Sequence, residues 1–119
     1  MALWRVGMAT MYVIAGPLFC NCELGSQIVA MPVEQVRSGA FHCGEWVMLC
    51  YSTRNCRVYQ VGDVGPLTPY SVKMGDDYVP IVADVPAPAP FRGLSAPVKV
   101  YKLKMQLERQ EERDGFLTG

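Results

Sequence analysis

An aspartate stands between two glycines in the segment Val61-Gly62-Asp63-Val64-Gly65, at the end of an apolar stretch. A carboxylic acid that is partly buried keeps its proton to higher pH, and such a group can donate that proton to a substrate oxygen. The two glycines would let a ligand approach the backbone closely. The alternative is that Asp63 is a loop aspartate that accepts hydrogen bonds from backbone N–H groups. Asp63 is therefore a candidate functional residue, with both interpretations open.

The five cysteines are the second group of residues with possible chemistry. Cys50 and Cys56 flank a polar turn between two predicted strands, where cross-strand neighbours come close enough for a disulfide bond. A disulfide implies an oxidising location. A competing hypothesis is a zinc site, with ligands from Cys20, Cys22, His42 and Cys43. Because C-x-C and adjacent His-Cys are poor spacings for one ion, we predict no metal site.

Composition narrows the class of protein that must position these groups. The chain has 119 residues, of which 50% are apolar and 18% charged, which is enough for one small core. Lys+Arg and Asp+Glu are both 11, so there is no general electrostatic attraction to nucleic acid or to an anionic membrane surface. No nucleotide-binding glycine motif is present, and no cofactor is expected. The 11 glycines and 9 prolines favour a β-rich domain with many turns.

Hydrophobic patterning predicts a mainly β domain over residues 1–103. The predicted strands are residues 3–15, 27–31, 45–51, 56–61, 70–74, 78–82 and 95–103, with one helical turn at 33–37. In the first strand, strict alternation puts Thr10 on one face as its only clearly polar residue. Proline at every second position of residues 84–90 predicts extended polyproline geometry. Residues 104–119, rich in helix formers, are predicted to be a helical tail.

The N-terminal segment superficially resembles a signal peptide, with Arg5 before an apolar run. The residues before Cys20 are Pro17, Leu18 and Phe19, where a processing site needs small residues, so no cleaved signal peptide is predicted. No apolar run is long enough to predict a transmembrane helix.

Three motifs, in order, resemble the barwin, expansin and rare-lipoprotein-A superfamily. Gly7-Met8-Ala9-Thr10-Met11-Tyr12 is similar to its opening G-x-A-T-x-Y. Residues 28–49 (IVAMPVEQVRSGAFHCGEWVML) resemble the segment that leads through a C-G motif into a strand, and residues 61–67 (VGDVGPL) resemble its V-x-D-R-G-P-F loop. The resemblance covers residues 7–101 and implies a six-stranded double-psi β-barrel, whose closed sheet leaves few exposed edges.

The resemblance also implies chemistry. In this superfamily the aspartate at the position of Asp63 lies in a groove and donates a proton to a glycosidic oxygen. A glycosidase normally needs a second carboxylate, whereas a lytic transglycosylase manages with one because the sugar's own hydroxyl attacks. The superfamily's second aspartate is replaced by Ser71 here. Other candidates for a second acid are Asp76, Asp77 and Asp84, the first two following Gly75 as a turn would.

The disulfide pairing and the sugar contacts follow from the same resemblance. Cysteines with the separation of Cys50 and Cys56 are bridged in expansins, and the cysteine at the position of Cys43 pairs with one in the first loop, here Cys20 or Cys22. Tyr12, Trp46 and Tyr70 are candidates for stacking on sugar rings, although aromatic residues in strands more often belong to the core or the surface.

Two hypotheses on function result. The first is a module that binds bacterial cell-wall glycan or cleaves peptidoglycan in the manner of a lytic transglycosylase, with Asp63 as acid. The second is a non-catalytic structural subunit of a larger assembly, such as a phage virion or tail, that contacts other subunits through its termini. Both place the protein outside the cytoplasm or in a virion.

Overall fold

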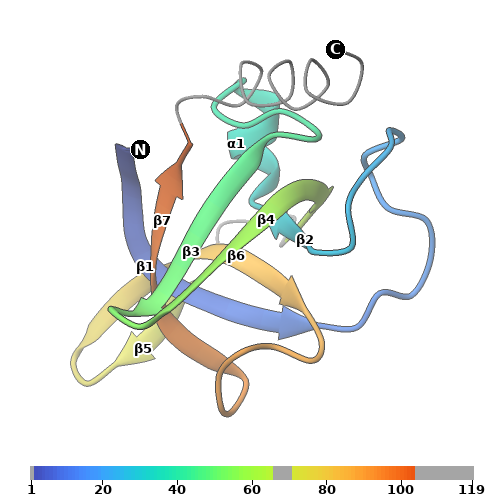
Figure 1. Ribbon diagram of the computed structural model, residues 1–119. Coiled ribbons are helices and arrows are strands. Elements are labelled where there is room, and N and C mark those ends of the chain that lie inside the picture. The colour runs from blue at the N-terminus through green and yellow to red at the C-terminus, as the bar shows by residue number, and fades with distance from the viewer. Residues whose placement is uncertain (1, 66–70, 104–119) are drawn as a thin grey trace.

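The computed structural model describes residues 2–65 and 71–103, and its elements are almost all strands (Figure 1). The predicted mainly β class is confirmed. The predicted tail at 104–119 lies outside the described residues. The elements are β1 (Ala2–Tyr12), β2 (Ile28–Met31), α1 (Val33–Arg37), β3 (Trp46–Ser52), β4 (Asn55–Val64), β5 (Ser71–Met74), β6 (Asp77–Pro86) and β7 (Ser95–Lys102).

Strand pairing links six of the seven strands in a cycle. The sheet order is β1-β7-β3-β4-β2-β6-β5, and an additional pairing joins β1 to β6. Two pairs are parallel, β1 with β6 and β2 with β4, and the others are antiparallel. β5 pairs only with β6, as a hairpin outside this cycle. The short β2 thus lies between the two long strands β4 and β6.

The core lies between these strands. Its largest fully buried side chain is Phe41, from the loop that follows α1, and the ring of Trp4 packs edge-on against it with centroids 4.6 Å apart. The rest of the core is mainly aliphatic: Ala9, Val29, Met31, Val47, Leu49, Val61, Val82, Ala83, Val85, Val98 and Val100, with Tyr59. Burial of these β-branched and aliphatic side chains is the main favourable contribution to folding.

Burial in the first strand does not follow the predicted alternation. Gly7, Met8 and Ala9 are all buried, where β1 lies between β7 on one side and β6 on the other. Gly7 also has no room for a side chain, since an added Cβ would lie 2.5 Å from the carbonyl oxygen of Pro80. This glycine therefore permits the close approach of β1 to β6.

Two strands, β4 and β6, are longer than the sequence suggests. β4 continues through Asp63 to Val64, and β6 runs to Pro86, so Asp84 lies in a strand and not in a polyproline segment. The physical reason is burial: Val82, Ala83 and Val85 are nearly inaccessible to solvent and are part of the core. Asp84 pairs with Thr10 of β1 in a regular parallel register. Both aspartates are consequently held by the sheet.

Two disulfide bonds are present, Cys50–Cys56 as predicted and Cys20–Cys43 as one of the two pairings left open. Their Cα atoms are 4.0 and 5.5 Å apart, respectively. Cys22 is free and exposed. Because Cys20 and Cys43 are bonded to each other, the competing zinc hypothesis is wrong. Two disulfides are typical of proteins that function outside the cytoplasm.

Candidate functional site

Asp63 sits near the end of β4 and accepts three hydrogen bonds. Oδ2 accepts one from the hydroxyl of Tyr12 at 3.1 Å. Oδ1 accepts two from backbone N–H groups, of Phe19 at 3.1 Å and of Val64 at 3.0 Å. The backbone N–H donors of the sequence-based alternative are therefore present, but the third donor is a side-chain hydroxyl, and Asp63 lies in a strand and not in a loop. Three donors that converge on one carboxyl group fix its position.

Asp84 lies in a different environment. It is partly buried, and Oδ1 accepts one hydrogen bond, from the Thr10 hydroxyl at 2.8 Å. Burial raises the pKa of Asp84 above its ordinary value, the hydrogen bond from Thr10 lowers it, and the negative charge of Asp63 raises it further, with a net increase. A carboxyl group with a raised pKa retains its proton closer to neutral pH, which is the property required of a general acid.

β2 brings the two aspartates together. Ala30 is the Cα partner of Asp63 on one side and of Asp84 on the other. Because neighbouring strands are about 4.8 Å apart, the two aspartate Cα atoms are about 10 Å apart. A Cβ added to Gly65 would lie 3.9 Å from Asp84 Oδ2, which is ordinary van der Waals contact. Gly65 therefore lies directly beside this oxygen.

The Tyr12 hydroxyl interacts electrostatically with both carboxyl groups. Burial, the charge of Asp63, the hydrogen bond to Asp63 and the charge of Asp84 all raise the pKa of the Tyr12 hydroxyl well above its ordinary value. The hydroxyl therefore stays protonated and serves as a donor to Asp63. Its sequence-based role as a sugar-stacking residue remains a prediction.

The other predicted site residues lie elsewhere or outside the described residues. Trp46 is the Cα partner of Gln60, three residues before Asp63 on β4, and its ring faces Gly25. Tyr70 lies outside the described residues. Gly75 has a positive φ of 65° in the tight turn between β5 and β6, as expected for the segment that holds Asp76 and Asp77. Of the candidates for a second acid, Asp84 is the one that the structure places beside Asp63.

Gly62 has a structural role in place of the predicted role in ligand approach. An added Cβ would lie 3.0 Å from side-chain atoms of Ile28 and Leu24. Its carbonyl oxygen accepts a hydrogen bond from the backbone N–H of Cys20 at 3.1 Å. Gly62 therefore packs β4 against β2 and holds the loop that follows β1.

That loop supplies a site residue that sequence reasoning did not select. Phe19 donates its N–H to Asp63, while the residue itself is 58% exposed. The next residue, Cys20, is buried and bonded to Cys43. Thr10 is the second unselected residue. Its isolation as the polar member of an apolar strand face was a usable signal, whereas the contact of Phe19 is long-range and has no local signal.

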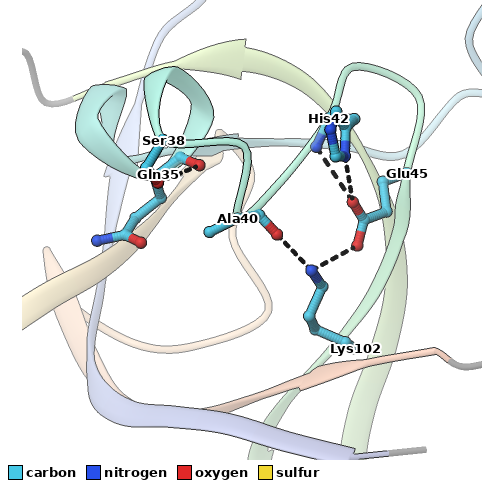
Figure 2. Close-up of polar contacts among 6 residues, drawn as sticks. All are labelled: Gln35, Ser38, Ala40, His42, Glu45 and Lys102. Carbon is cyan, nitrogen blue, oxygen red and sulfur yellow. Dashed lines mark hydrogen bonds and ion pairs between the residues drawn. The ribbon is translucent and has the colours of Figure 1, made fainter.

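A second polar cluster holds the loop that carries Cys43 (Figure 2). Lys102, at the end of β7, donates to the carbonyl oxygen of Ala40 and lies 3.3 Å from Glu45 Oε2. Oε1 of Glu45 accepts the backbone N–H of His42 at 3.1 Å. The His42 side chain is 75% exposed, in agreement with its interpretation as a loop residue. These contacts fix the Cys43 side of the Cys20–Cys43 bond to the sheet.

Comparison with known proteins finds no family model, no curated protein and no solved structure that matches this chain. In the described ranges, 2–65 and 71–103, no group of three or more acidic, histidine or cysteine side chains could hold a metal ion. None of the helices in that part of the chain is long and apolar enough to cross a membrane. The function must therefore be argued from the site itself.

Proposed function

We propose that this protein is a cell-wall glycan-binding module that cleaves peptidoglycan in the manner of a lytic transglycosylase, with Asp84 and Asp63 at its centre. The observation that carries the proposal is the pair of aspartates on either side of Ala30, of which Asp84 has a raised pKa. Enzymes commonly place two carboxyl groups in different environments, so that one keeps a proton and acts as the acid while the other stays ionised.

The fold proposed is the double-psi β-barrel. Two observations support it: the cycle of strand pairs, which returns from β6 to β1, and the presence of two parallel pairs, β1–β6 and β2–β4, in a sheet that is otherwise antiparallel. The resemblance of residues 7–101 to barwin, expansin and rare-lipoprotein-A domains points to the same fold.

In the proposed reaction Asp84 is the acid. Its proton passes to the glycosidic oxygen as the bond from that oxygen to the anomeric carbon breaks, and the C6 hydroxyl of the same sugar bonds to that carbon. The hydroxyl proton returns to Asp84, so no water enters and the carboxyl group is regenerated. Thr10 orients the group through its hydrogen bond to Oδ1, which leaves Oδ2 beside Gly65 for the proton.

Asp63 is assigned a different role from Asp84, that of a negative charge beside the acid. The sequence-based hypothesis makes Asp63 the acid, but its two oxygens already accept hydrogen bonds from three donors. A fixed negative charge at this position keeps the proton on Asp84 and stabilises positive charge that develops on the sugar ring.

The proposal is tested by incubating purified peptidoglycan with the protein and detecting anhydro-sugar products by mass spectrometry. Asp84→Asn is expected to abolish release, because the amide cannot donate the proton, and Asp63→Asn to reduce it by about 100-fold, the scale of one lost electrostatic contact in a transition state. Equal activity of wild type and Asp84→Asn would contradict the assignment. Failure of the wild type both to release product and to sediment with the wall would contradict the whole proposal and favour the structural-subunit hypothesis.

A further inference from the structure

An exposed aromatic residue lies beside the aspartate pair. Its backbone nitrogen is 3.1 Å from Asp63 Oδ1, and the first ring carbon of Phe19 is three covalent bonds from that nitrogen. Although phenylalanine is usually buried, this residue is 58% exposed. The Phe19 ring therefore begins within a few ångströms of a carboxyl group of the candidate site.

The segment that bears this ring is anchored on both sides. The Phe19 N–H is bound to Asp63, and the following N–H, of Cys20, is bound to the carbonyl oxygen of Gly62 at 3.1 Å. Cys20 is also buried and covalently attached to Cys43. The loop that carries Cys43 is in turn held by Glu45 and Lys102 (Figure 2).

These anchors fix the backbone from which an exposed apolar ring projects. A binding residue whose backbone is already ordered loses less conformational entropy when a ligand packs on its side chain. The apolar face of an aromatic ring matches the C–H face of a pyranose, and carboxyl groups close to such a ring can accept hydrogen bonds from sugar hydroxyl groups.

We infer that Phe19 is a sugar-binding platform, on which one pyranose ring of a cell-wall glycan stacks so that its glycosidic bond reaches Asp84. This inference rests on the proposed function and adds a specificity residue to it. The Cys20–Cys43 bond then has a role in ligand binding, because it fixes the position of the platform relative to the two acids.

The test compares three substitutions of Phe19 by isothermal titration with soluble glycan strands of alternating N-acetylglucosamine and N-acetylmuramic acid. All three keep the backbone N–H group that donates a hydrogen bond to Asp63. Phe19→Ala and Phe19→Leu are both expected to weaken binding by about 2- to 10-fold, the scale of an aromatic stacking contact. Phe19→Trp is expected to keep or improve the affinity, since only a ring can stack.

Tyr78→Ala provides the matched control. Tyr78 is also exposed, at 68%, but it lies six residues before Asp84 on β6, or about 20 Å along the strand. This variant should bind as the wild type does. All variants should unfold at nearly the same temperature, which separates lost binding from lost structure.

The outcomes distinguish the two proposals. If the wild type binds the glycan and Phe19→Ala binds it with the same affinity, the platform is overturned and the proposed function stays intact. Equal weakening in Phe19→Ala and Tyr78→Ala would also overturn it, because the effect would not be local. Loss in Phe19→Ala but full affinity in Phe19→Leu would show a plain apolar contact and overturn stacking. No binding by the wild type would overturn both proposals together.

Discussion

The two disulfide bonds lie in regions that use the same covalent link for different purposes. Cys50–Cys56 joins directly opposed residues of the β3–β4 hairpin, six positions apart in the chain. Cys20–Cys43 joins two loops across 23 positions, next to Gly62 and the aspartate pair. In Figure 1 the hairpin turn and the loop after β1 lie on opposite sides of the molecule.

The difference shows which part of the fold needs help to hold its geometry. The hairpin already has the cross-strand hydrogen bonds of β3 and β4, so its disulfide reinforces a structure that local pairing specifies. The loop after β1 forms no strand over residues 13–27 and depends on a few long-range contacts. Removing each bond should therefore have different consequences for stability and for the site.

Removing the long-range bond should have the largest effect. For the double variant Cys20→Ser/Cys43→Ser we expect a loss of about 3.4 kcal/mol in the free energy of unfolding, from the chain entropy of a loop of this length. Binding to peptidoglycan should weaken as well, because Phe19 and the backbone donor to Asp63 lose their anchor. Denaturant unfolding and wall sedimentation measure the two effects, and unchanged sedimentation would contradict a positional role for this bond.

Removing the hairpin bond should cost less and spare the site. Cys50→Ser/Cys56→Ser is expected to lose about 2.2 kcal/mol by the same relation, since its loop is shorter. At a temperature where the variant is folded, product release from peptidoglycan should equal that of the wild type. A drop in activity as large as in the other double variant would remove the distinction between the two regions.

A pair of tyrosines sharpens the comparison at the level of one hydroxyl group. Tyr12→Phe removes a donor to Asp63, and Tyr51→Phe removes the partner of the Tyr59 hydroxyl, 3.1 Å away near the hairpin. Each should cost about 1 kcal/mol in unfolding free energy, as one lost hydrogen bond does. Only Tyr12→Phe should also slow peptidoglycan cleavage, and equal kinetics in the two variants would contradict the role given to Tyr12.

The smallest expected effect is a pH dependence that originates at the site. Because the pKa of Asp84 is raised on folding, this group binds more protons in the native than in the unfolded state between about pH 4, the ordinary range of aspartate, and its native pKa. Stability from this group is therefore greatest below that pH and falls as pH rises through the native pKa. Asp84→Asn should flatten this part of the profile in denaturant unfolding, and parallel profiles would contradict the raised pKa.

The sequence was sufficient to predict those elements that have strong local patterns. Alternating and β-branched residues located the strands, and the hairpin turn located the Cys50–Cys56 bond. β6 was predicted too short because the alternating prolines 86, 88 and 90 resemble a polyproline segment, whereas pairing with β1, and of Asp84 also with β2, makes residues 83–86 a strand. For that reason Asp84 was one candidate among three, although it is the residue that lies beside Asp63.

The site could be predicted only where one motif contains it. Asp63 was visible from its glycine-flanked loop, and Tyr12 from its aromatic type. The pairing of Asp63 with Phe19, 44 positions away, and of Asp84 with Thr10, 74 positions away, depends on the closed order of strands. No local pattern encodes these distances.

The four buried residues of β2 set a constraint on how this molecule can change. Ala30 is the Cα partner of both aspartates. The register of β2 against β4 and β6 therefore sets the position of Asp63 relative to Asp84 along the strands. A shift of one residue would turn every β2 side chain to the opposite face. An insertion within residues 28–31 would therefore shift the two acids relative to each other.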